Sequence, residues 1–191
     1  MALFSILLKS GLDLKKIEMM PLLMAVTLHQ VLIPYLPDLQ IKWPNDLVLY
    51  DLKLCGILSE SIMEDRNPAC LIIGTGINVQ TENFPDELKL TATSLYLETD
   101  TKMDINQLID EILFAFKSAL DAFDQGNLDV IDYINRYSSL KNRTVHFYTS
   151  DREETAQVVK IDHDGSLMVV LSSGGIKLLR SGEVTLSKLH K

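Results

Sequence analysis

Apolar residues recur at helical spacing in two long segments of the chain. From Glu18 to about Leu32 they fall three and four residues apart, and two prolines follow shortly afterwards and end the pattern. From Ile105 to Phe123 the same spacing returns, and Asp104 stands where a helix N-cap is expected. The pattern therefore predicts two amphipathic helices, and a shorter helix at Leu128–Tyr137.

Short apolar runs bounded by turn residues predict strands in the rest of the first 140 residues. Residues 2–8 have strand length, although their periodicity does not separate a strand from a buried helix. A polar stretch at 64–68 is typical of a hairpin loop, and another at 80–89 of a longer loop. Four strand-like stretches follow the first predicted helix: Gln40–Trp43, Leu47–Tyr50, Leu54–Ser61 and Cys70–Ile73.

Beyond Lys141 the pattern changes to short β-rich runs. The pairs Asp164-Gly165 and Gly174-Gly175 separate some of them, and both pairs are hairpin signals. Such closely spaced strands predict a small β-barrel appended to an α/β domain. The runs are Thr144–Tyr148, Thr155–Ile161, Ser166–Leu171, Gly175–Leu179 and Glu183–Leu186.

Composition is that of an ordinary soluble globular protein. The chain has 191 residues, of which 47% are hydrophobic, and this length accommodates one domain or a medium domain with a small one. A formal net charge of −8 argues against non-specific nucleic-acid binding, and no apolar run approaches the length of a membrane span. The two cysteines form no framework, which favours a reducing cytoplasm.

Candidate chemistry concentrates in the stretch IKWPNDLVLYDLKLCGIL at 41–58. A plain hairpin could use Asn45-Asp46 as its turn and leave Lys53 in solvent. A ligand site could instead use the indole of Trp43 as a stacking face and Lys53 as a cation for phosphate or carboxylate. Composition and spacing alone leave both readings open.

Strand alternation gives the expected directions of the side chains around Lys53. Residues two apart in a strand share a face. The expectation is Lys53, Cys55 and Ile57 on one face, with Leu54, Gly56 and Leu58 on the other.

A second candidate is the stretch 74–79, GTGINV. It lacks the glycine that the dinucleotide fingerprint needs at its sixth position, and the P-loop ending is absent. Gly74 and Gly76 are therefore read as close backbone packing or a turn, with ligand contact the less common alternative. Asn78 adds a carboxamide that could pair with the edge of a base.

Taken together, these stretches make the chain resemble the biotin protein ligases. The motifs occur in the order typical of that family and at similar spacing over nearly the whole chain. They are Lys42-Trp43-Pro44-Asn45-Asp46, Lys53-Leu54-Cys55-Gly56-Ile57-Leu58, Gly74-Thr75-Gly76-Ile77-Asn78-Val79, Ala92-Thr93-Ser94-Leu95 and Ser181-Gly182-Glu183-Val184-Thr185-Leu186.

The resemblance implies an α/β (α+β) fold. A catalytic domain at 1–140, with a mixed sheet flanked by helices, would precede an SH3-like barrel at 141–191. It also implies a reaction in which biotin and ATP give biotinyl-5′-AMP, which then biotinylates a lysine of a biotin carrier domain of a carboxylase. ATP, biotin and Mg²⁺ are the implied cofactors, with no direct protein ligand to the metal.

The resemblance also implies a role for each residue. Lys53 would be catalytic, since a cation between the biotin carboxylate and the α-phosphate offsets their repulsion. The glycine turn of Gly74 and Gly76 would lie near the adenylate. The other implied contacts are Trp43 and Asn78 with adenine, Asn45 and Asp46 with the phosphates, and Gly56, Ile57 and Leu58 with the biotin ring.

One departure from the family pattern qualifies these expectations. Members carry a basic Gly-Arg-Gly-Arg-type loop ahead of the part matched by residues 3–8, whereas this sequence begins at Met1, directly at the following strand. The expectation is an N-terminally incomplete catalytic domain that retains the adenylate poorly and has an unpaired sheet edge, open to a homodimer. A DNA-binding helix-turn-helix is also missing, so no DNA partner is expected. The alternatives are an impaired fragment or relic that only binds nucleotide or a partner chain, and a lipoate ligase-like enzyme.

Overall fold

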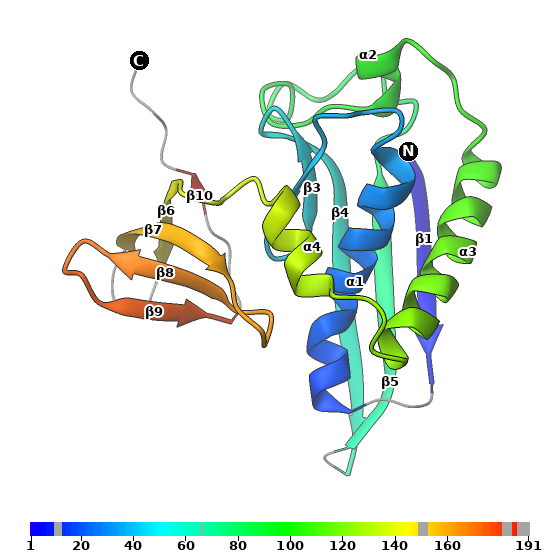
Figure 1. Ribbon diagram of the computed structural model, residues 1–191. Helices are drawn as coiled ribbons and strands as arrows, with labels where there is room; N and C mark the ends of the chain where they lie inside the picture. The colour runs from blue at the N-terminus through cyan, green and yellow to red at the C-terminus, as the bar shows by residue number, and fades with distance from the viewer. Residues whose placement is uncertain (10–12, 66, 149–152, 181–184, 187–191) are drawn as a thin grey trace.

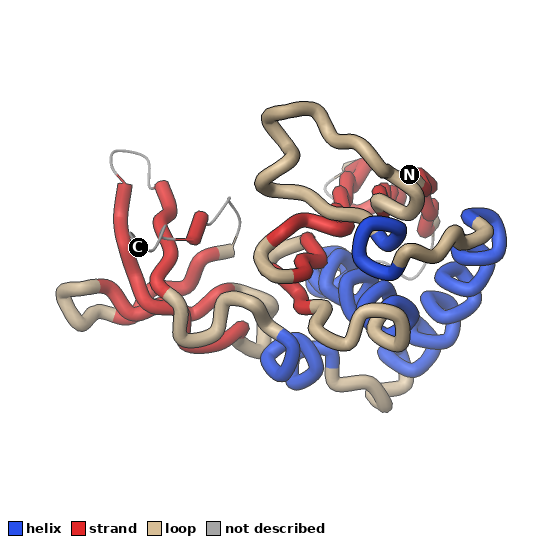
Figure 2. Tube along the Cα trace, turned by 90° about the horizontal axis from the view of Figure 1, so that it is seen from above, coloured by secondary structure: helices blue, strands red, loops and turns tan. Residues whose placement is uncertain are grey.

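Two antiparallel sheets and four helices make up the described part of the chain. The structure is a computed structural model and describes residues 1–9, 13–65, 67–148, 153–180 and 185–186. Figure 1 shows the larger sheet behind its helices, with the smaller sheet to one side, and the view from above in Figure 2 agrees. No helix in these ranges is long and apolar enough to cross a membrane.

The larger sheet has the strand order β1-β5-β4-β3-β2. Its strands are β1 (Ala2–Leu8), β2 (Gln40–Lys42), β3 (Asp46–Leu49), β4 (Leu52–Glu64) and β5 (Asn67–Ile77). Every pair of neighbouring strands is antiparallel, so the expectation of a mixed sheet is wrong. The physical reason is that β2 to β5 follow one another through short connections, which only antiparallel strands permit.

Helices cover one face of this sheet. The long helix α1 (Leu14–Leu32) begins four residues earlier than expected, because the side chain of Asp13 accepts a hydrogen bond from Lys16 N and caps it. Beside α1 lie α3 (Ile105–Asp124), capped by Asp104 as expected, and α4 (Val130–Tyr137). A short helix, α2 (Leu95–Thr99), has no counterpart in the sequence pattern.

The opposite face of the sheet is open at its centre. Leu58, on the central strand β4, is 62% exposed, and Leu3, on the edge strand β1, is 71% exposed. In the described residues, therefore, the two faces differ sharply: one is buried under α1 and the other presents apolar side chains to solvent.

The smaller sheet has the order β10-β6-β7-β8-β9. Its strands are β6 (Thr144–Tyr148), β7 (Glu153–Ile161), β8 (Leu167–Leu171), β9 (Ile176–Leu179) and β10 (Thr185–Leu186). Four of the predicted runs thus contain strands, and the described end of the fifth, residues 185–186, forms β10. In the described residues β9 and β10 do not pair, so the sheet is not closed. The SH3-like barrel stays a prediction, and residues 181–184 of the last motif lie outside the described residues.

A buried histidine predicts how stability responds to pH. His29 is fully buried; its Nε2 lies 2.9 Å from Leu39 O, so this nitrogen carries the proton, and its Nδ1 lies 2.9 Å from the Tyr133 hydroxyl, which donates to it. Burial lowers the pKa of His29 below its ordinary value of 6.5, against a smaller opposite effect of the Leu39 bond. The folded protein therefore resists a proton that the unfolded chain accepts.

We expect the free energy of unfolding to fall as the pH drops below about 6.5, by at most about 1.4 kcal/mol per pH unit from this group, and to be unaffected by it above that pH. Urea unfolding of the wild-type and His29→Gln proteins across this range measures the effect as a difference in slope. Equal slopes for the two proteins would contradict the prediction.

Candidate active site

Strand β4 carries an irregularity at the centre of the candidate site. Cys55 pairs with Leu47, but Lys53 pairs with the next residue of β3, Val48, so Leu54 is an extra residue on β4. Leu54 and Cys55 are both buried as a result, and a methyl group built on Gly56 would lie 3.0 Å from Lys53 Cε. The expected alternation is therefore wrong at Lys53, because a β-bulge turns its side chain to the Gly56 face.

The ammonium group of Lys53 is paired with Asp46. Lys53 Nζ lies 2.7 Å from Asp46 Oδ1, and the two side chains are 50% and 18% exposed. Asp46 is the first residue of β3 and pairs directly with Gly56 of β4, which fixes its distance from the bulge. Asp46 thus holds a partly exposed cation in one place at the sheet surface.

Glycine at position 56 leaves the space that the lysine side chain occupies. A methyl group there would lie 3.0 Å from Lys53 Cε and 3.1 Å from Nζ, tighter than ordinary van der Waals contact. Lys53 consequently lies across the backbone of its own strand, with its charge above Gly56.

The main chain of Lys53 is held from the other side by the loop before α2. Lys53 N donates to Thr91 O at 2.7 Å, and Thr93 N donates to Lys53 O at 3.0 Å. These bonds form an isolated parallel bridge between Lys53 and Ala92. The Ala92-Thr93 motif thereby has a structural role that the sequence pattern alone does not reveal.

A cavity of about 560 Å³ opens on the uncovered face beside Lys53. The structure brings seven predicted site residues to it: Asn45, Lys53, Gly56, Ile57, Leu58, Gly74 and Gly76. Four further lining residues were not predicted: Leu3, Phe4, Ser5 and Thr75. Three of these lie on β1, and only the β1–β5 register, which pairs Leu3 with Gly76 and Ser5 with Gly74, reveals their place.

The three other predicted residues are not among those that line this cavity. Asp46 is next to it, since its carboxylate pairs with the ammonium group of Lys53. The Asn78 amide lies 3.5 Å from Lys53 O, at the end of β5. Trp43 is 2% exposed, and its Nε1 donates to Gly165 O of the smaller sheet at 2.9 Å.

Half-buried Asn45 and buried Cys55 lie beside Lys53 and have structural roles. The Asn45 side chain donates to Ile57 O at 2.6 Å, and Ile57 N donates to Asn45 O at 2.9 Å, which binds the turn to β4. Burial raises the pKa of the Cys55 thiol far above its ordinary value, with a smaller contribution from the charge of Asp46. Cys55 is thus a neutral core residue and not a nucleophile.

Chemically, the site offers one fixed cation at the end of an apolar cavity whose floor is partly glycine. Such a floor admits a flat ligand close to the backbone, and the cation suits an anionic group at the end of that ligand. Among the described residues no three histidine, cysteine or acidic side chains gather as a metal site.

Residues 1–78 match the biotin/lipoate A/B protein ligase family. The bifunctional ligase/repressor BirA of Bacillus spizizenii is 33% identical over 187 residues, which cover 95% of this chain and 57% of that protein. The Escherichia coli BirA is 31% identical over 155 residues, 80% of this chain and 47% of that protein.

Solved structures of biotin protein ligases have the same fold as this chain. The apo biotin protein ligase of Aquifex aeolicus has a TM-score of 0.81 at 25% identity, with 96% of this chain and 80% of that chain covered. The same enzyme in complex with biotin and ATP has a TM-score of 0.80. The chain therefore belongs to the biotin protein ligase family, and it spans about half the length of the curated relatives that it matches.

Proposed function

We propose that the chain activates biotin with ATP and transfers it to a lysine of a biotin carrier domain. In the first step a carboxylate oxygen of biotin bonds to the α-phosphorus of ATP, and the bond to the leaving pyrophosphate breaks. In the second step the neutral amine of the carrier lysine bonds to the acyl carbon, AMP leaves, and the amine loses a proton. No covalent intermediate on the enzyme is needed.

The observation that carries this proposal is the position of Lys53. Its ammonium group is held 2.7 Å from Asp46 at the edge of the cavity and above the glycine floor. A carboxylate and a phosphate repel each other, and negative charge spreads over the phosphoryl oxygens in the transition state. A cation already fixed between them lowers that barrier without reorganising solvent.

The remaining cavity residues suit the two substrates. Gly56, Ile57 and Leu58 would contact the biotin ring, while Gly74 would let the adenylate approach the backbone of β5. At Gly76 the same approach requires the Leu3 side chain to move, since its Cδ2 lies 3.1 Å from the position of a methyl group there. Mg²⁺ would bind with the phosphates of ATP and offset their charge.

For the nucleotide, the proposal assigns Asn45 and Asp46 to the phosphates and Asn78 and Trp43 to adenine. The Trp43 ring is 2% exposed, so stacking would require the ring to become accessible when ATP binds. Its fluorescence would report that change.

We further propose the predicted organisation and partners: a catalytic domain at 1–140, an SH3-like barrel at 141–191, a cytoplasmic location and a carboxylase carrier domain as acceptor. A homodimer through the free edge of β1 belongs to the same proposal, since β1 is the last strand of its sheet.

The proposal is tested by incubating the chain with biotin and Mg·ATP and detecting biotinyl-AMP by mass spectrometry. Addition of a biotin carrier domain then tests transfer as a mass increase on that domain. Product with biotin supports the proposal. Product only with lipoate or octanoate would instead identify a lipoate ligase-like enzyme.

A second candidate is a chain that binds nucleotide without turnover. Calorimetric binding of ATP in the absence of any adenylate product would favour this candidate over the ligase.

A further inference from the structure

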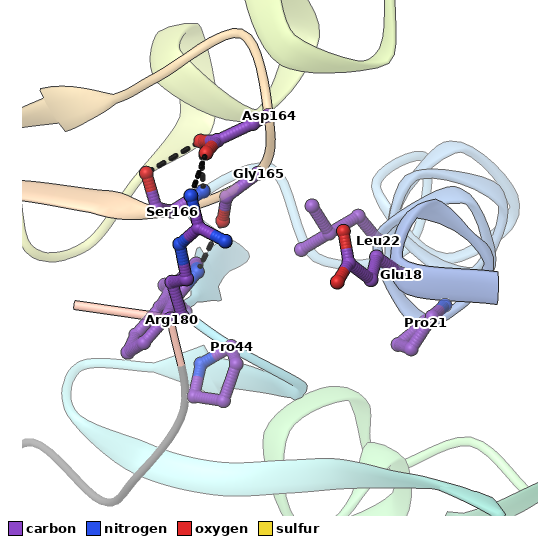
Figure 3. A pocket seen from close by; sticks show the side chains of 9 residues that line it. Glu18, Pro21, Leu22, Pro44, Asp164, Gly165, Ser166 and Arg180 are labelled. Carbon is purple, nitrogen blue, oxygen red and sulfur yellow. Dashed lines mark hydrogen bonds and ion pairs between the residues drawn. The ribbon is translucent and has the colours of Figure 1, made fainter. Parts of the chain in front are cut away.

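One turn beside the smaller sheet contacts Trp43, one of the predicted site residues. This turn, residues 162–166 between β7 and β8, places the Gly165 carbonyl 2.9 Å from Trp43 Nε1, which donates to it. Trp43 is the only tryptophan of the chain and is 2% exposed. Gly165, Leu22 of α1 and Pro44 are among the residues that line a cavity of about 160 Å³. Figure 3 shows how these three residues lie around it.

The turn fits closely against α1. Gly165 has φ +84°, and a methyl group built on it would lie 3.0 Å from Leu22 Cδ1 and 3.6 Å from Met19 Sδ. Asp164 braces the turn from within, since its carboxylate accepts a hydrogen bond from Ser166 N at 3.0 Å (Figure 3). The equivalent turn between β8 and β9 is different, because a methyl group on Gly174, at φ +86°, would meet nothing within 4 Å.

An amide from α4 fixes the base of the same turn. Asn135 Nδ2 donates to Ile161 O at 2.8 Å, and Ile161 N donates to Asn135 Oδ1 at 2.7 Å. Both ends of the turn are therefore attached to the larger domain, the base through Asn135 and the tip through Trp43 and Leu22.

Trp43 is directly connected to the site. Asn45, which binds Ile57 O, and Asp46, which pairs with Lys53, follow it by two and three residues. Only Pro44 and Asn45 separate Trp43 from Asp46, so a displacement of the indole acts close to the residue whose carboxylate pairs with Lys53.

We propose that the turn 162–166 is a positioning element for Lys53. The Gly165 carbonyl fixes the indole of Trp43, and this keeps the Asp46 carboxylate 2.7 Å from the ammonium group of Lys53. Gly165 and Asn135 are positioning residues, since neither lines the Lys53 cavity. The inference deepens the proposed function and rests on it for the catalytic consequence, while the mechanical link is measurable without activity.

The test uses the full chain with Gly165→Ala, which pushes the tip off Leu22, and Asn135→Ala, which releases the base and suits a helix. Gly174→Ala is the matched control, since it carries the same backbone strain without the contact. Circular dichroism checks that each protein is folded.

Two readouts need no substrate. We expect red-shifted Trp43 emission and stronger acrylamide quenching in Gly165→Ala and Asn135→Ala, but not in Gly174→Ala. Loss of the Asp46 pair should also raise the rate at which acetic anhydride labels Lys53, measured by peptide mass spectrometry with Lys89 as internal reference. In the wild-type protein the ammonium group is held 2.7 Å from Asp46 Oδ1, and this contact competes with the reagent for the amine.

If the chain forms biotinyl-AMP, kcat should fall in both variants more than in the control. Unchanged quenching or unchanged Lys53 labelling in folded Gly165→Ala and Asn135→Ala would overturn the positioning role. Absence of adenylate in the wild-type protein would count against the proposed function alone, because the fluorescence and labelling results stand without it.

Discussion

Replacement of Lys53 by alanine is expected to lower the rate of biotinyl-AMP formation by about 10²–10³-fold while the fold persists, the usual cost of removing one preorganised group that stabilises transition-state charge. The side chain is 50% exposed and packs on a glycine, so its loss opens no cavity in the core. The measurement is biotinyl-AMP formed in single-turnover reactions, with circular dichroism of both proteins.

Two further variants test whether the loss comes from the charge of Lys53 and whether it is specific to this lysine. Lys53→Arg keeps the charge but spreads it over a planar guanidinium in place of a point charge 2.7 Å from Asp46, and so most of the loss should remain. Lys89→Ala removes a lysine that pairs with Asp86 on the surface, and its activity should equal that of the wild-type protein. Equal activity of Lys53→Ala and wild-type protein would favour the non-catalytic alternative.

The long elements were predictable because their signals are local. The amphipathic spacing of α3 and its cap at Asp104 need no tertiary information, and the same holds for the hairpin turn at Asp164-Gly165. β4 and β5 are longer than predicted, since a ladder between two antiparallel strands continues through polar and glycine positions when the partner strand is in register.

The site was predictable only in part. Its residue types stood out as a cluster, but the direction of Lys53 did not, because the bulge at Leu54 depends on how β4 pairs with β3. The β1 residues of the cavity carry no polar signal at all; Leu3 joins the site because its strand lies beside Gly76. The resemblance implies that Trp43 stacks on adenine. Its hydrogen bond to Gly165 was not predictable from a local pattern, because the two residues are 122 positions apart.

A single methyl group at position 56 is expected to cost the proposed ligase about tenfold or more in kcat, which corresponds to about 1.4 kcal/mol of transition-state stabilisation. In Gly56→Ala the new carbon would lie 3.0 Å from Lys53 Cε and 3.1 Å from Nζ. The flexible end of Lys53 can move away, so the free energy of unfolding should change by less than about 1 kcal/mol, and alanine suits a strand better than glycine does. The displaced Nζ, however, can no longer lie 2.7 Å from Asp46.

Gly74→Ala separates this effect from simple blocking of the cavity. A methyl group there would lie 3.6 Å from Leu58 O and 3.8 Å from Ser5 Oγ, which is ordinary contact and does not involve Lys53. Both variants narrow the cavity and should raise a KM, that for biotin in Gly56→Ala and that for ATP in Gly74→Ala, but only Gly56→Ala should also lower kcat. Steady-state kinetics of biotinyl-AMP formation resolve the two constants. A rise in KM alone for Gly56→Ala would mean that the glycine serves the ligand and not the lysine, because a displaced cation weakens the transition state whether or not biotin is saturating.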